Sequence, residues 1–132
     1  MKKKKIEKVL YRLNSINLES VEMENNTDLF NIIIKDSYKI NEITDVTLNL
    51  EFSRSLRFEP KGLYKLVMKF EAVFNLVGDK NGDEFTDDYI KLNIKSLYEK
   101  TGISSYMVKA IADISSIGGA QPIVSPIEFI VD

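Results

Sequence analysis

The longest regular pattern in the sequence is an alternation of apolar and polar side chains over residues 46–76, which read VTLNLEFSRSLRFEPKGLYKLVMKFEAVFNL. In its first half, every even position from 46 to 58 is apolar except Arg54, and the odd positions are polar. A period of two residues is typical of a β-strand with one buried face. After the Pro-Lys-Gly stretch at 60–62 the alternation resumes. The two halves therefore predict an antiparallel hairpin.

Two further alternations precede this hairpin. Residues 30–40 have the same period, with Asp36 as the polar exception on the apolar face. Residues 16–23 also predict a strand, but its apolar positions change from even to odd around Glu19 and Ser20. One inserted residue, a β-bulge, would restore the register there. Four antiparallel strands are thus predicted before any helix.

The period becomes helical towards the C-terminus. Residues 86–100 place four large apolar side chains on one helical face, with Thr86 or Asp87 as N-cap and Gly102 as C-terminal stop. A strand over 89–94 is the alternative, because apolar residues also alternate there. A second helix is predicted over 104–117, with Ser104 as its N-cap. Its apolar stripe consists of Met107, Ala110, Ile111, Ile114 and Ile117.

The remaining chain, 121–130, contains two prolines and is predicted to be extended. The order of the elements, strands first and helices last, predicts an α+β fold. We expect one four-stranded antiparallel sheet and the helices to form two layers.

The composition excludes most catalytic and metal chemistry. The 132 residues include no cysteine and no histidine, which removes disulfides, thiolate nucleophiles, ordinary zinc sites and proton transfer by imidazole. Residues 79–83 have the acidic spacing of a calcium loop, but Glu84 stands where such a loop needs glycine. We therefore expect no enzyme, no cofactor and no metal site.

One alternative to this expectation is a small enzyme or ligand-binding domain. Asp36 and Arg54, the polar exceptions on two apolar strand faces, would then form a buried charged site. Positions at a strand edge or a subunit contact explain both residues as well. An apolar pocket that contained both would favour the enzyme.

The charges are unevenly distributed along the chain. Residues 1–12 contain six basic side chains and one acidic one, whereas the chain as a whole has a net charge of −2. We expect a flexible basic arm over 1–12 and a single domain over 13–132. The alternative for the arm is a tether to nucleic acid or to an acidic membrane surface.

The sequence lacks the apolar segments that would direct it to a membrane. No apolar stretch follows the first lysines as in a signal peptide, and none is long enough to span a membrane. We expect a cytoplasmic protein that neither inserts into membranes nor binds nucleic acid.

The predicted strands are longer than the predicted helices. A strand of ~13 residues spans ~43 Å and a helix of ~14 residues only ~21 Å. The helices cannot cover the whole sheet, so we expect a dimer or tetramer. The stripe of the second helix, Met107 to Ile117, is expected at or near the subunit contact.

A family resemblance rests on residues 105–129, which read SYMVKAIADISSIGGAQPIVSPIEF. A tyrosine lies near the start of the helix, an Asp-Ile-Ser step precedes two glycines, and a proline-rich stretch ends in phenylalanine. This order resembles the hallmark of the SecB-like chaperones. The matching residues are Tyr106, Asp113, Ile114, Ser115, Gly118, Gly119, Pro122, Pro126 and Phe129. The stretch Ile16-Asn17-Leu18-Glu19 also resembles the first strand of that family.

The chain also departs from the family pattern. Ser105 and Val108 stand where the family has proline and arginine, and the chain ends three residues after Phe129, without the family's second C-terminal helix. Val67 falls near the place where the family presents an acidic contact for the translocation motor. The resemblance thus implies a short SecB-like form without a dedicated role in protein export.

The resemblance implies an oligomeric, ATP-independent chaperone or adaptor that binds extended, non-native polypeptide. The alternative on the same fold is a scaffold, or a protein that neutralises one specific partner, and the short C-terminus favours it. The expected polypeptide contacts are Met68, Phe70, Phe74, Tyr106, Ile123, Val124, Ile127 and Phe129. Packing in the hydrophobic core is the other explanation of these side chains.

Overall fold

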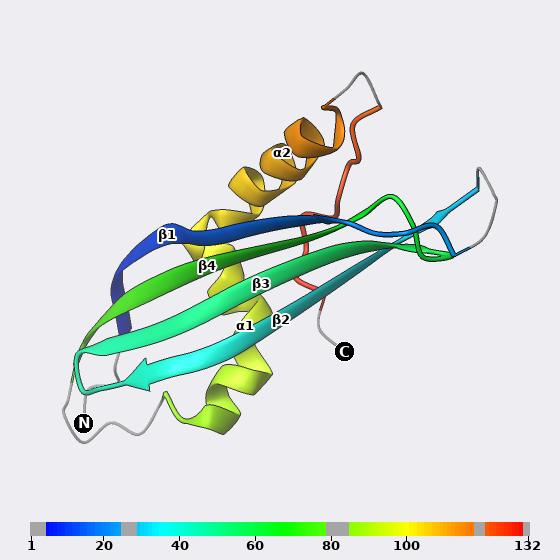
Figure 1. Cartoon of the computed structure of the whole chain (residues 1–132). Helices are drawn as coiled ribbons and strands as arrows, with labels where there is room; N and C mark the ends of the chain where they lie inside the picture. The colour runs from blue at the N-terminus through cyan, green and yellow to red at the C-terminus, as the bar shows by residue number, and fades with distance from the viewer. Residues whose placement is uncertain (1–4, 25–28, 79–84, 118–120, 131–132) are drawn as a thin grey trace.

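A computed structural model describes residues 5–24, 29–78, 85–117 and 121–130. Its elements, in chain order, are β1 (Lys5–Ser20), β2 (Asn31–Ile43), β3 (Thr47–Glu59), β4 (Tyr64–Val77), α1 (Asp87–Thr101) and α2 (Ile103–Ser115). The strands form one antiparallel sheet in the order β1-β4-β3-β2. Both helices lie on one side of this sheet (Figure 1), which we call its inner face. The predicted α+β fold in two layers is confirmed.

The predicted hairpin is formed by β3 and β4, and Phe52 lies opposite Phe70 in its register. The even-numbered side chains of β3, Arg54 included, are buried on the inner face, as are those of β4 from 66 to 76. The odd-numbered side chains lie on the outer face, where most are only partly buried. The period of two residues in the sequence therefore predicted which side of each strand faces the helices.

The first strand corrects the boundary that we expected at residue 12. β1 begins at Lys5 and pairs with β4 along its whole length, so residues 5–12 are part of the sheet. Residues 1–4 lie outside the described residues. The register shifts lie between Ile6 and Lys8 and between Leu13 and Ser15, not at Glu19–Ser20, so the predicted position of the bulge was wrong. These two shifts keep most of the large apolar side chains of β1 on the inner face, with Leu10 as the exception on the outer face.

The helix α1 starts and stops where the capping residues predict. The Thr86 hydroxyl accepts a hydrogen bond from the Tyr89 amide at 3.2 Å, and Gly102 ends the helix in the left-handed conformation, with φ of 76°. The alternative strand over 89–94 was wrong. A left-handed residue directly after a helix favours glycine, because glycine has no Cβ.

The second helix begins one residue earlier than predicted. Ser104 lies inside α2, so its assignment as N-cap was wrong. The Thr101 hydroxyl accepts from the Ile103 amide at 3.0 Å and donates to the Tyr98 carbonyl at 2.6 Å, which links the two helices through a short corner. α2 ends at Ser115, two residues before the predicted end at 117.

The hydrophobic core lies between the inner face of β3 and β4 and the two helices. Among the described residues, no helix is long and apolar enough to cross a membrane, and no group of three or more acidic side chains is placed to hold a metal ion. The calcium-like spacing at 79–83 lies outside the described residues.

Candidate functional site

The two polar exceptions on the inner face form a buried ion pair. Asp36 of β2 and Arg54 of β3 are cross-strand partners, and their side chains are 0% exposed. The guanidinium contacts the carboxylate through two parallel hydrogen bonds, from Nε to Oδ1 at 2.7 Å and from Nη2 to Oδ2 at 2.8 Å. This bidentate geometry is the strongest that the two groups can adopt.

The ion pair holds residues 121–130, which we call the C-terminal segment. Arg54 donates to the carbonyls of Pro126 and of Glu128, the latter at 2.9 Å. The Asp36 carboxylate accepts from the Ile130 amide at 2.7 Å, and the Asp36 amide donates to the Ile130 carbonyl at 3.2 Å. In Figure 1 this segment runs back from α2 towards β2. The two charged side chains therefore clamp main-chain groups, which explains why two strand faces tolerate a polar residue.

The clamp leaves little of the ion pair available to a ligand. Both side chains are buried, and no buried side-chain nitrogen or oxygen of the described residues lacks a hydrogen-bond partner. An enzyme site built on Asp36 and Arg54 would need the carboxylate or the guanidinium itself to be exposed in an open pocket. The structure instead gives both residues a role in packing the C-terminal segment.

Phe129 is the apolar anchor of the C-terminal segment. Its side chain is 2% exposed, and its ring centroid lies 5.3 Å from that of Phe52 and 4.6 Å from that of Tyr98. Burial raises the pKa of Tyr98 to about 12, although the nearby Arg54 charge acts in the opposite direction. Phe129 is therefore a core residue rather than a surface contact.

The other expected polypeptide contacts divide into two groups. Met68, Phe70 and Phe74 are 0% exposed beneath the helices, so they are core residues like Phe129, and Ile123 is partly buried against the same core. The alternation placed these side chains on the inner face but could not show that helices cover them. Exposed side chains remain at Tyr106, Val124 and Ile127.

The expected subunit contact on α2 is largely used within the chain. Met107 and Ile111 are buried in the core, and Ala110 and Ile114 are partly buried against it. Ile117 is exposed. The apolar stripe therefore serves first to attach α2 to the sheet, and only its last residue faces solvent fully.

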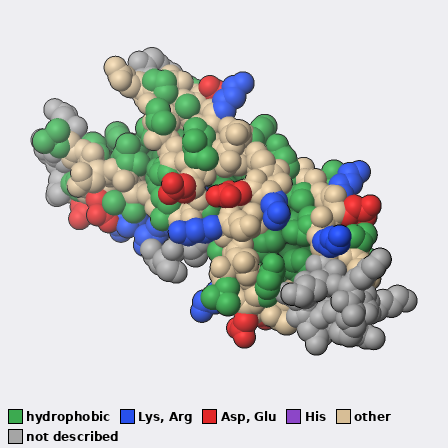
Figure 2. Space-filling model, turned by 180° about the vertical axis from the view of Figure 1, so that it is seen from behind, with side chains coloured by type: hydrophobic (Ala, Val, Ile, Leu, Met, Phe, Trp, Pro, Cys, Tyr) green, Lys and Arg blue, Asp and Glu red, His purple; other side chains and the backbone are tan. Residues whose placement is uncertain are grey.

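The structure reveals an uncovered apolar surface that the sequence reasoning missed. It consists of the inner-face side chains of β1, Tyr11, Leu13, Ile16 and Leu18, which we call the β1 face. They are between 37% and 51% exposed, although their cross-strand partners on β4 are buried. Figure 2 shows apolar side chains in several patches on the surface seen from the side opposite to Figure 1.

Tyr106 of α2 extends the β1 face. The Phe70 ring lies between two tyrosines, with its centroid 6.3 Å from that of Tyr11 and 5.6 Å from that of Tyr106. Tyr106 is 48% exposed. β1 is also an edge strand, so one row of its main-chain groups has no partner strand among the described residues. The alternation of apolar residues over 9–18, read with a shift near residue 14, is the sequence signal that could have identified this surface.

Comparison with known proteins supports the fold alone. No protein-family model and no curated protein sequence matches the chain. A solved structure of a SecB-like chaperone from Mycobacterium tuberculosis, in complex with a ChAD peptide from the HigA1 antitoxin, is similar with a TM-score of 0.65 and 11% identity, over 94% of this chain and 90% of that one. A protein of unknown function from Streptococcus agalactiae is similar over 96% of this chain and 98% of that one, with 10% identity and a TM-score of 0.40, which is too low to support an argument. The four-stranded sheet, the two helices and the first of these similarities together show that the chain has a SecB-like fold.

Proposed function

We propose that this protein is an oligomeric, ATP-independent chaperone or adaptor that binds an extended apolar segment of another polypeptide. Two observations support the proposal: the SecB-like fold, and the uncovered apolar surface next to a free sheet edge. The similar mycobacterial chaperone was solved with a peptide bound. We expect the protein to act in the cytoplasm.

The observation that carries the proposal is the β1 face. An extended segment can add a strand to an open sheet edge through main-chain hydrogen bonds, while its alternate side chains pack on the neighbouring face. β1 offers both the edge and the apolar side chains, with Tyr106 at their side. Main-chain pairing depends little on sequence, so such a site accepts many segments. The exposed Val124 and Ile127 of the C-terminal segment offer further apolar contacts.

The proposal includes self-association as a dimer or tetramer. The part of the α2 stripe that still reaches the surface is Ala110, Ile114 and Ile117, of which Ile117 is 74% exposed. A subunit contact at this end of α2 would leave the β1 face open to polypeptide. Replacing Ile117 by aspartate should then lower the molar mass in solution. The same change at Leu92, which is 84% exposed on α1, is the matched control.

The test of polypeptide binding uses two leucines of the same strand. Leu18 lies on the β1 face and is 51% exposed, whereas Leu10 lies on the outer face and is 54% exposed. Light scattering of a denatured enzyme diluted into buffer reports its aggregation with and without the protein. We expect the wild type and Leu10→Asp to suppress aggregation and Leu18→Asp to lose this effect. A bound apolar segment would bury the new carboxylate of the β1 face without a partner, which costs free energy.

The molar mass of each variant separates binding from assembly. If Leu18→Asp lowers the molar mass while Leu10→Asp does not, the β1 face is a subunit contact, and its role in polypeptide binding is contradicted. If the wild type itself suppresses no aggregation, general chaperone activity is ruled out. The function would then be that of a scaffold, or of an adaptor that neutralises one specific partner.

A further inference from the structure

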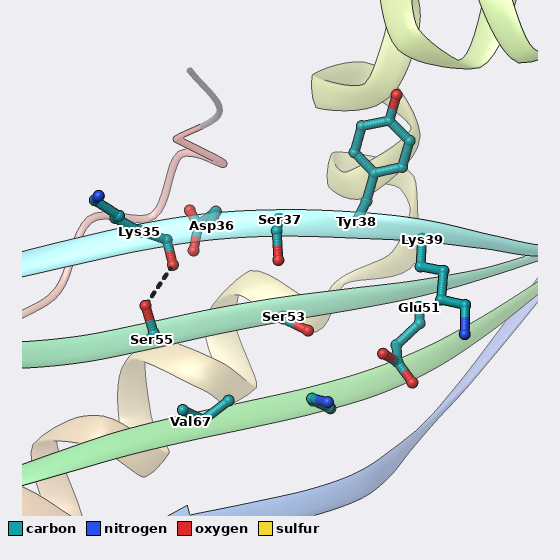
Figure 3. Close-up of a pocket in the computed structure, with 10 residues that line it drawn as sticks. Lys35, Asp36, Ser37, Tyr38, Lys39, Glu51, Ser53, Ser55 and Val67 are labelled. Carbon is teal, nitrogen blue, oxygen red and sulfur yellow. Dashed lines mark hydrogen bonds between the residues drawn. The ribbon is translucent and has the colours of Figure 1, made fainter.

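The outer face of the sheet contains an open depression that the proposed polypeptide site does not use. It lies across β2, β3 and β4 and has a volume of about 630 Å³. Its floor includes three small hydroxyl side chains, those of Ser37, Ser53 and Ser55. Figure 3 looks onto this surface, with the helices on the far side of the sheet. The depression exists because these serine side chains are short, whereas the lysine side chains around them are long.

Three lysines surround this floor. Lys35 and Lys39 come from β2, and Lys69 comes from β4 on the other side. The register fixes their arrangement, because Ser53 is the cross-strand partner of both Ser37 and Lys69. Lys35 and Lys39 are four residues apart, which corresponds to ~13 Å along an extended strand. The three lysines thus come from the two strands that flank β3.

The charges of this depression are unbalanced. No acidic side chain of the described residues forms an ion pair with Lys35, Lys39 or Lys69. Two acidic residues, Asp36 and Glu51, also line the depression, but the Asp36 carboxylate is buried and paired with Arg54. Among the described residues that line the depression, three lysines therefore accompany one acidic side chain outside the buried ion pair, that of Glu51, in a chain whose net charge is −2. A local excess of positive charge on an acidic protein attracts a negatively charged partner.

We propose that this depression docks an acidic segment of another polypeptide in extended conformation. Carboxylates four residues apart on an extended chain have the same spacing as Lys35 and Lys39, so one such segment can pair with both. A further carboxylate of the same bound segment, on the side that faces β4, can pair with Lys69. The serine hydroxyls can donate to and accept from polar groups of the bound segment. The site is separate from the β1 face, which lies on the other side of the sheet.

The lining favours an acidic polypeptide over a nucleic acid. Single-stranded nucleic acids bind through aromatic side chains that stack on bases as well as through basic ones. Of the lining residues that the structure describes, Tyr38 is the one aromatic, and it has an even number and belongs to the inner-face set of β2. Glu51 also lies beside Lys39, where it would repel a continuous row of phosphates. Separate carboxylates can be placed around it.

The test measures binding of a short fluorescein-labelled peptide of alternating aspartate and serine by fluorescence anisotropy. The variant Lys35→Gln/Lys39→Gln/Lys69→Gln removes the charges around the depression. The matched control Lys91→Gln/Lys95→Gln/Lys109→Gln removes three charges from exposed positions on the helices. We expect the first variant to bind at least about tenfold more weakly and the control to change by less than about twofold at moderate salt. Thermal unfolding should show that both variants remain folded.

Further arms of the experiment decide whether the proposal stands. The wild type should prefer the aspartate peptide to the same peptide with asparagine, and Ser53→Asp, which places a carboxylate on the floor, should remove this preference. Equal weakening by both triple variants would show that only net charge matters and would overturn the docking site. The absence of any binding by the wild type would do the same. Tighter binding of a single-stranded oligothymidine of equal charge would contradict the acidic polypeptide as partner. None of these outcomes depends on the suppression of aggregation by the β1 face.

Discussion

The neighbouring strands β4 and β1 carry the same kind of alternation, but only one of them is buried. Phe70 and Met68 of β4 are 0% exposed, whereas their direct partners on β1, Leu13 and Ile16, are 37% and 43% exposed. Adjacent strands are only about 4.8 Å apart. The difference therefore depends on how far the helical layer reaches, since it covers β3 and β4 and leaves the side chains of β1 partly in water. Amphipathic alternation in the sequence identifies the side of a strand that faces the helices, but not how many strands the helices cover.

The largest expected effect would uncover the inner face near the opposite edge of the sheet, at β2. Arg54→Met removes the donor that holds the C-terminal segment and leaves the buried Asp36 carboxylate without its charged partner. We expect a loss of about 3–5 kcal/mol in the free energy of unfolding, measured with denaturant. Hydrogen exchange at Ile130 should also become faster, because its amide bonds to Asp36. The double variant Arg54→Met/Asp36→Leu should recover part of the loss, and a cost below about 1 kcal/mol for the single variant would contradict the clamp.

A matched pair of truncations measures the contrast between β4 and β1 directly. Phe70→Ala removes a fully covered ring and should cost about 3–5 kcal/mol. Leu13→Ala, on the neighbouring strand, should cost about 1 kcal/mol or less, because more of its side chain is already in water. Denaturant unfolding of both variants gives the two values. Equal losses would mean that the β1 face is covered in solution, for example by another subunit.

The same contrast exists inside the C-terminal segment, over a distance of two residues. Phe129 is 2% exposed and Ile127 is 68% exposed. Phe129→Ala should lower the free energy of unfolding by about 3–5 kcal/mol, whereas Ile127→Ala should change it by about 0.5 kcal/mol. A Phe129→Ala variant with an unchanged melting temperature would show that the ring is not part of the core.

The smallest expected effect concerns the hydroxyl of Tyr98, a polar group buried in the core. Tyr98 has its pKa raised from 10.0 to about 12, so the folded state holds its proton more tightly than the unfolded state. Its contribution to stability is complete below pH 10 and is lost as the pH rises towards 12. Tyr98→Phe should therefore lose less stability than the wild type between about pH 8 and about pH 11. Near pH 7 it should differ by less than about 1 kcal/mol, because the hydroxyl makes only a 3.8 Å contact with the Met107 sulfur. Melting temperatures at several pH values check both statements, and parallel profiles would contradict the raised pKa.

The sequence predicted the elements that depend on local periodicity. The alternation around Arg54 identified β3 and β4 and their inner faces, and Thr86 and Gly102 identified the ends of α1. The position of the bulges in β1 was not predicted, because it depends on pairing with β4, which is distant in the sequence. The apolar positions do change phase between Leu13 and Ile16, but only the pairing with β4 shows that a register shift lies between Leu13 and Ser15.

The candidate site was less predictable, because the exposure of its side chains depends on which distant segments of the chain pack over them. Phe129 and Val124 are both apolar residues of one proline-containing stretch, yet one is in the core and the other is 83% exposed. Their difference follows from the clamp of Asp36 and Arg54, which needs the register of β2 on β3. The sequence did contain a signal for it, since a single polar residue interrupts each of the two apolar faces.

The pairing of β1 with β4 also determines when this part of the sheet can form. β2, β3 and β4 follow each other through short connections, so their hairpins are local. The residues of β1 pair with partners much later in the chain, from Ser20 with Tyr64 to Lys5 with Val77. Contacts between distant residues require a larger loss of chain entropy before they form. We therefore expect β1, the first of the four strands to be synthesised, to join the sheet last, with its apolar side chains unpaired until β4 has been made.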